Sequence, residues 1–252
     1  MGTRGVVGFR HNQKDYATYN HFDSYPTCVG AQVLKQLSRF NLKNADELNF
    51  IRNKISEIKL INDEHLFDER EQDIILREIE ALGFAHNDYD PEHFGNGKVD
   101  AYFLLNPLQG SIISYIDKHH SIPYMIESSD FLMDSLFCEW AYIINLDENV
   151  IEFYRGFNKD PESKGRYVFQ GIDPNAEPDD YLGVALLGTV SFDTLATWSD
   201  VDIELFCERL QSYPYALNVE KYGKEYAMPA ESLRKVSQDL STLKDVPVSI
   251  NK

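Results

Sequence analysis

Two runs of aromatic and β-branched residues, separated by a short polar segment, constrain the fold of this chain more than any other feature. Residues 140–146 read WAYIINL and residues 150–155 read VIEFYR, with the polar residues 147–149 between them. Aromatic and β-branched side chains favour strands, and a tight polar turn between two such runs is typical of a β-hairpin. We therefore expect an antiparallel hairpin over residues 138–155.

A second hairpin is predicted at the start of the chain, followed by helices. Apolar residues precede a polar turn at 11–14, and residues 16–21 supply the returning strand. Apolar residues at helical spacing, with Thr27 as a cap and Asn44 and Glu47 as a capping box, predict the first two helices. The remaining expected elements are helices over residues 29–40, 44–58, 68–82, 200–212 and 233–243, and strands over residues 167–169 and 184–187.

This order of elements predicts an α+β fold. Strands near both ends with helices between them favour a layered sandwich of mainly antiparallel sheet and helices rather than repeated βαβ units. An αββα sandwich is one form of that arrangement. We expect residues 1–252 to form a single domain with a helical insertion at about 44–100, and the turn-rich stretch 85–100 is the best candidate for a boundary.

The charge balance restricts the partners that the chain can bind. Lys and Arg total 24 against 41 Asp and Glu, which gives a formal net charge of -17. That charge opposes binding to nucleic acid through phosphate neutralisation, and the dispersed acidic residues fit ordinary solubility better than mimicry of DNA. Three scattered cysteines and the lack of a long apolar run predict a cytoplasmic protein with no membrane span.

Polar and aromatic side chains cluster at the ends of the two strands in the N-terminal hairpin. Neighbouring strands about 5 Å apart can bring the Thr3 hydroxyl close to the corner that follows the second strand. The alternative is structural: Arg4 pairs with Asp23, while Asn20 and Ser24 satisfy backbone groups at the turn. The residues singled out as candidates are Thr3, Arg4, Asn20, His21, Asp23 and Tyr25.

The second hairpin adds three candidates, Cys138, Glu139 and Trp140. Glu139 lies beside an apolar indole and could have a raised pKa suited to acid or base work. Cys138 could be a thiol nucleophile, but a buried structural cysteine is the favoured alternative. No ligand spacing supports a metal site, since the acidic loop at 86–93 lacks the required glycine, and no glycine-rich phosphate loop supports a nucleotide cofactor.

Four strings carry a resemblance to known families: MGTRG at 1–5, YNHFDSYP at 19–26, DSLFCEWAY at 134–142 and YRGF at 154–157. Together they resemble a family of phage, bacterial and fungal proteins that brings no established activity. The first two are also similar to the N-terminal nucleophile (Ntn) hydrolases, including class II glutamine amidotransferases and the choloylglycine hydrolase group. Those enzymes begin with a nucleophile on the first strand and carry an Asn-containing corner soon after. Here removal of Met1 would leave Gly2 rather than Thr3 at the terminus, which departs from that pattern.

The preferred hypothesis is hydrolysis or transfer at an amide-like bond of a small polar substrate, without a cofactor. Thr3 would be the nucleophile, Asn20 the oxyanion donor and Asp23 the orienting carboxylate, with Glu139 as a further acid or base. Substrate would be held by Arg4, His21, Tyr25, Cys138 and Trp140. The alternatives are a non-catalytic interaction or inhibitor protein, such as a viral protein that binds a host partner, and a protein that sequesters a small ligand.

Overall fold

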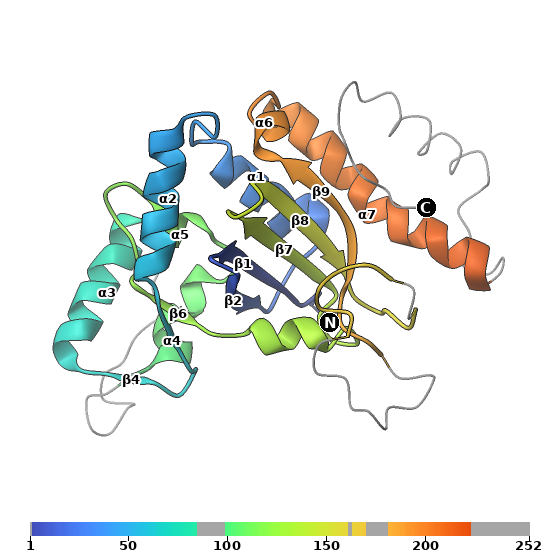
Figure 1. Cartoon of the computed structure of the whole chain (residues 1–252). Coiled ribbons are helices and arrows are strands. Elements are labelled where there is room, and N and C mark those ends of the chain that lie inside the picture. The colour runs from blue at the N-terminus through green and yellow to red at the C-terminus, as the bar shows by residue number, and fades with distance from the viewer. Residues whose placement is uncertain (1, 85–98, 161–162, 170–180, 223–252) are drawn as a thin grey trace.

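A five-stranded sheet lies at the centre of the protein (Figure 1). The computed structural model describes residues 2–84, 99–160, 163–169 and 181–222, and in these residues the strand order is β2-β1-β7-β8-β9. β1 runs parallel to β7, and the other three neighbouring pairs are antiparallel. The strands are β1 (Gly5–His11), β2 (Lys14–Asn20), β7 (Trp140–Asn145), β8 (Val150–Arg155) and β9 (Ala185–Ser191).

Both predicted hairpins are confirmed, and the parallel pair joins them side by side. β1 pairs with β2 from Gly5 opposite Asn20 to the turn, and β7 pairs with β8 from Trp140 opposite Arg155 to the turn. In the β1–β7 ladder Gly5 also lies opposite Trp140. A mainly antiparallel sheet with helices is the α+β class that the sequence predicts.

Side chains alternate between the two faces of the sheet, and each face packs against a separate apolar cluster. On the first face, Val7, Phe9 and Tyr142 belong to the large cluster that also contains residues of α1, α2 and α7. On the second face, Val6 and Ile143 belong to a smaller cluster covered by irregular segments. The second cluster consists of Val6, Ala17, Leu132, Cys138, Ala141, Ile143, Tyr154, Tyr167 and Val184.

Of the caps that the sequence predicts, Asn44 is confirmed as the N-cap of α2, but Glu47 Oε2 accepts the amide of Asn41 rather than that of Asn44, so the predicted capping box is incomplete. Asn44 accepts hydrogen bonds from the amides of the first turn of α2, and Asp68 forms a capping box with Glu71 at the start of α3. Thr27 does not cap, because its hydroxyl donates to Gln211 instead. The helices are η1 (Pro26–Gly30), α1 (Ala31–Leu37), α2 (Ala45–Glu57), α3 (Glu69–Ala81), α4 (Ala101–Leu105), η3 (Asn106–Leu108), α5 (Ile113–Ile116), η4 (Ser129–Met133), α6 (Phe192–Leu195) and α7 (Asp200–Tyr222).

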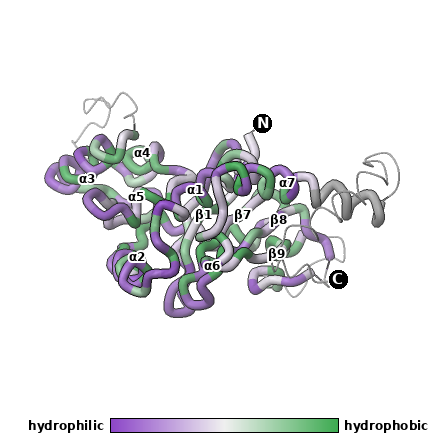
Figure 2. The backbone as a smooth tube through the Cα atoms, turned by 90° about the horizontal axis from the view of Figure 1, so that it is seen from above, coloured by the Kyte–Doolittle hydropathy of each residue, from purple (hydrophilic) through white to green (hydrophobic). Residues whose placement is uncertain are grey.

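The helices α2 to α5 form a group beside the sheet, with two small sheets among them (Figure 1). Seen from above, α2 and α3 carry many hydrophilic residues, as expected for helices with one solvent-facing side (Figure 2). No helix in the described part of the chain is long and apolar enough to cross a membrane. The short strands are β3 (Lys59–Ile61) paired with β6 (Tyr124–Ile126) and β4 (Leu66–Phe67) paired with β5 (Val99–Asp100).

Some predicted elements differ from the structure or fall outside it. Residues 167–169 form a turn rather than a strand, and the Tyr167 side chain packs in the second-face cluster. An αββα sandwich requires two stacked sheets, whereas the two sheets that accompany the central one in the described residues have two strands each. The predicted helix at 233–243 and most of the boundary stretch 85–100 lie outside the described residues.

Candidate functional site

The sequence-predicted residues lie at one end of the central sheet, where β1 and β7 begin and β2 and β8 end. We call this the motif end. Backbone hydrogen bonds connect the candidate segments there: the amide of Ser24 donates to the Thr3 carbonyl at 3.1 Å, and the amide of Glu139 donates to the Arg4 carbonyl at 3.0 Å. The parallel β1–β7 ladder therefore brings the two conspicuous sequence regions together.

At this end the Asn20 side chain stabilises the turn after β2. Its amide nitrogen donates to the Phe22 carbonyl at 2.5 Å and to the Ser24 hydroxyl at 2.6 Å. An amide group has two N–H donors, so both are used by the protein itself. Asp23 is exposed and has a φ of 52°, a conformation that Asp tolerates in turns. This is the structural role considered for Asn20, and an oxyanion would have to displace one of these bonds.

Arg4 and His21 are held by aromatic neighbours. The Arg4 guanidinium carbon lies 4.5 Å from the centroid of the Phe137 ring. The Tyr19 hydroxyl and His21 Nδ1 are 2.8 Å apart. Burial raises the pKa of Tyr19, and the nearby Arg4 cation opposes that shift. Arg4 therefore contacts Phe137 and Tyr19 rather than the carboxylate of Asp23.

The three candidates from the second hairpin point to different places. Cys138 is fully buried in the second-face cluster, where burial raises the pKa of its thiol well above the usual value. Trp140 is buried on the first face. Glu139 is half-buried, with Oε2 3.9 Å from Nη1 of Arg155, and its carbonyl accepts a hydrogen bond from the same nitrogen at 2.6 Å. Of the three, only Glu139 leaves side-chain surface for a substrate.

Exposed apolar side chains lie on the segments that meet at the motif end, and the sequence analysis singled out only Tyr25 among them. Phe22 is 61% exposed, Phe157 46% and Phe137 43%. Arg155 lies between two rings, 4.7 Å from the Trp140 centroid and 4.9 Å from that of Phe157. The aromatic patch, as we name it, consists of Phe22, Tyr25, Leu136, Phe137 and Phe157.

Phe157 adopts a backbone conformation that is unfavourable for a bulky residue. Its φ is 55°, in the left-handed region, and its amide donates to the Ser135 carbonyl at 2.6 Å. L-residues other than Gly, Asn and Asp are strained there by about 1–2 kcal/mol. The preceding Gly156 lies against the carbonyls of Cys138 and Ser135, so the backbone just before Phe157 has no room for a side chain. Strained residues that persist in folded proteins concentrate at binding and catalytic sites.

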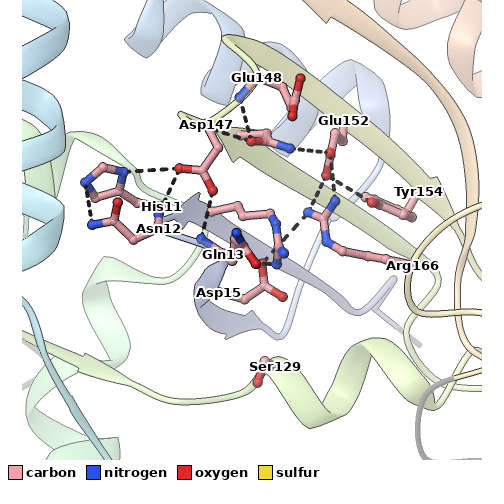
Figure 3. A network of polar contacts seen from close by, with 12 residues as sticks. His11, Asn12, Gln13, Asp15, Ser129, Asp147, Glu148, Glu152, Tyr154 and Arg166 are labelled. Atoms are coloured by element: carbon pink, nitrogen blue, oxygen red, sulfur yellow. Dashed lines mark hydrogen bonds and ion pairs between the residues drawn. The ribbon is translucent and has the colours of Figure 1, made fainter.

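A second polar cluster lies on the second face of the sheet, centred on the buried carboxylate of Glu152 (Figure 3). Arg166 donates to both of its oxygens, at 2.8 and 2.5 Å. Asn145 donates to Oε1 at 2.8 Å and Tyr154 to Oε2 at 2.9 Å. Burial disfavours the charged form of Arg166, but the bonds to Glu152 outweigh it and raise the pKa of the guanidinium.

The cluster continues to the β1–β2 hairpin through a second carboxylate. Nη2 of Arg166 lies 3.8 Å from Oδ1 of Asp15, which also binds Nη1 of Arg10 at 3.0 Å. Two guanidinium groups and two carboxylates alternate, so the cluster has no net charge. Its oxygens are largely occupied by protein donors, and its evident effect is to fasten the segment around Arg166 to the sheet.

A single carboxylate joins the turns of the two hairpins at the end of the sheet opposite the motif end (Figure 3). Asp147 accepts hydrogen bonds from the amides of Asn12 and Gln13, both at 2.8 Å. His11 Nδ1 lies 3.4 Å from its Oδ1. Asn12 and Gln13 both have positive φ values, and the two bonds help to hold that turn. Partial burial raises the pKa of Asp147, but the amide donors outweigh burial and lower it below its usual value.

We expect Asp147→Asn to lower the free energy of unfolding by about 1 kcal/mol at pH 7. The amides of Asn12 and Gln13 would then donate to a neutral amide oxygen instead of a charged carboxylate, and such bonds are weaker. The folded-state pKa of Asp147 is lowered, so its stabilising contribution is present above the unfolded value of about 4 and is lost as pH falls through the folded value. Urea denaturation of both proteins between pH 7 and pH 3 should therefore show a difference that shrinks with acid. A difference that is constant with pH would contradict this assignment.

Neither metal geometry nor similarity to known proteins assigns a function to the motif end. Within the described residues, no group of three or more His, Cys, Asp and Glu side chains is placed to hold a metal ion. The acidic loop at 86–93 lies outside those residues. In comparisons with known proteins, the chain matches no protein-family model, no curated protein and no solved structure.

Proposed function

We propose that the protein is a non-catalytic binding protein that docks a protein partner on the aromatic patch. The observation that carries this proposal is Phe157, a bulky apolar residue whose ring is displayed to solvent from a strained backbone position. The conformation is unfavourable, and the ring is only partly buried in the free protein, where Arg155 lies over it. A contact with a partner would bury the part of the ring that remains exposed.

The rest of the patch has the composition of an interface centre. Single exposed apolar side chains are common on protein surfaces, but several at one site mark binding surfaces. Aromatic residues and Arg are enriched among the residues that dominate binding energy. Here Arg4 and Arg155 are held over rings, so their side chains lose little conformational entropy when a partner docks.

The second candidate is the amide-bond hydrolase with an Ntn-type fold. It is favoured by the register, which brings the segments of Thr3, Asn20 and Glu139 to one sheet end. Two features favour binding over it: both amide protons of Asn20 are already used, and Thr3, the nucleophile of that hypothesis, is buried. Intact-mass analysis together with Thr3→Ala separates the two, because a nucleophile mechanism requires a chain that starts at Thr3 and loses all turnover in the variant.

The strain at Phe157 predicts an unusual order of stability among variants. Both Phe157→Ala and Phe157→Gly remove the ring, but only glycine relieves the left-handed conformation. We expect the glycine variant to be more stable than the alanine variant by about 1 kcal/mol, the reverse of the usual order. Chemical denaturation of the two variants checks this. If the alanine variant is the more stable, the backbone at Phe157 is not strained and the main support for the proposal is lost.

Site-specific photo-crosslinking tests the docking surface directly. Benzoylphenylalanine would replace Phe22 or Phe157 in one set of proteins and Val201 in a control, since Val201 is 61% exposed but lies at the start of α7, near the opposite sheet end. In cells that naturally contain the protein, we expect one adduct of the same mass from both patch positions and none from Val201. Adducts that do not differ between the patch and the control, or no adduct, would contradict the proposal.

A further inference from the structure

Two exposed aspartates lie close in the chain to residues of the aromatic patch, and they indicate the chemistry of its partner. Asp23 follows Phe22 in the chain, and Asp134 accepts the amide of Phe137 through its carbonyl; both residues are exposed. Resting on the proposed function, we infer that the partner is a basic protein segment, with apolar residues for the patch and Lys or Arg side chains for this acidic border.

The two arginines that contact the patch do not reverse this balance. Arg155 is already paired with the Glu139 carboxylate and lies between two rings. Arg4 is stacked on Phe137. The stacked guanidinium groups offer a partner a flat contact surface. The residues Asp23 and Asp134 are exposed to solvent, so their negative charge is available to attract a cation.

The charge of the whole chain points the same way. A net charge of -17 attracts a basic partner over distances up to about the Debye length of 8–10 Å and speeds its association. The same charge repels an acidic protein, a nucleic acid and a second copy of this chain. Charge complementarity therefore favours a basic occupant over each of these.

Two synthetic 18-residue peptides test this inference on the full-length protein. They share the same leucine and phenylalanine positions, and one carries lysine where the other carries glutamate. Fluorescence anisotropy in 50 mM and 300 mM salt would measure their binding. We expect the lysine peptide to bind at least about tenfold more tightly than the glutamate peptide, and its affinity to fall at the higher salt.

Variants with matched charge changes separate a specific border from general attraction. Asp23→Asn with Asp134→Asn should weaken the lysine peptide by about fivefold or more. Asp193→Asn with Asp200→Asn removes the same charge from exposed positions in α6 and α7 and should change binding less than twofold. Equal weakening by both pairs would overturn the inference, because the attraction would then be non-specific.

A third variant distinguishes failure of the inference from failure of the proposed function. Phe137→Ser keeps the charge and removes an exposed ring, and we expect it to weaken the lysine peptide about tenfold. If both peptides bind equally and both are weakened by Phe137→Ser, the patch is a docking surface whose partner is not basic. If Phe137→Ser leaves the binding of both peptides unchanged, the proposed function fails with the inference.

Discussion

Glu152→Leu is expected to lower the free energy of unfolding by about 3 kcal/mol, because it removes one partner of a buried ion pair and leaves Arg166 only its longer 3.8 Å contact with Asp15. It also removes the acceptor for the Asn145 amide and the Tyr154 hydroxyl. A buried donor without an acceptor carries its own desolvation penalty. Urea denaturation followed by tryptophan fluorescence and circular dichroism would measure the loss.

The matched control is the loss of both partners together. Arg166→Met alone should also destabilise the protein, since it leaves the Glu152 carboxylate buried without its cation. The double variant Glu152→Leu with Arg166→Met should lose less than the sum of the two single losses, because no unpaired charge remains. Additive losses would mean that the two side chains stabilise the protein independently, which their bidentate contact does not predict.

Gly156→Ala is expected to destabilise the protein by about 3 kcal/mol or more, because overpacking against backbone cannot be relieved by moving a side chain. A Cβ at this position would lie 2.1 Å from the Cys138 carbonyl oxygen and 2.6 Å from that of Ser135. Relief would require the end of β8 to move away from the segment before β7, which would also displace Phe157. Thermal unfolding and expression yield would report the effect.

Gly83→Ala provides the comparison for that variant. Gly83 has a φ of 82°, but nothing lies within 4 Å of where its Cβ would be. The substitution should therefore lower stability only by the conformational term, about 1 kcal/mol. Similar losses at Gly83 and Gly156 would show that the contact at Gly156 relaxes at little cost.

The elements that the sequence predicts well are those that depend on neighbouring residues. Both hairpins follow from apolar, β-branched and aromatic runs around polar turns, and the cap at Asn44 follows from local hydrogen bonding. The β1–β7 pairing joins segments separated by more than a hundred residues, and no local pattern sets its register. The turn at 167–169 shows the converse: an aromatic run resembles a strand, but it is used to cover a sheet face.

The site was harder to predict than the fold because it depends on how each polar group is partnered. Asn20 and Cys138 are conspicuous in the sequence, yet the amide of the first serves a turn and the second is buried. The Glu152–Arg166 pair was missed, although a lone carboxylate inside an apolar strand was an available signal for a buried ion pair. The exposure of Phe157 and its left-handed φ of 55° could not be foreseen, because no local sequence pattern places a bulky aromatic residue in that conformation.

The Asp147 contact has a consequence for how this protein can change over time. It connects the turns of the two hairpins by hydrogen bonds at the end of the sheet remote from the aromatic patch. The contact therefore holds the alignment of the strands at the end of the sheet remote from the aromatic patch. Residues of the patch can then change with a changing partner without loss of the fold. Among descendants of this chain, sequence variation should accordingly be larger around Phe22, Phe137 and Phe157 than in the two hairpin turns that Asp147 connects.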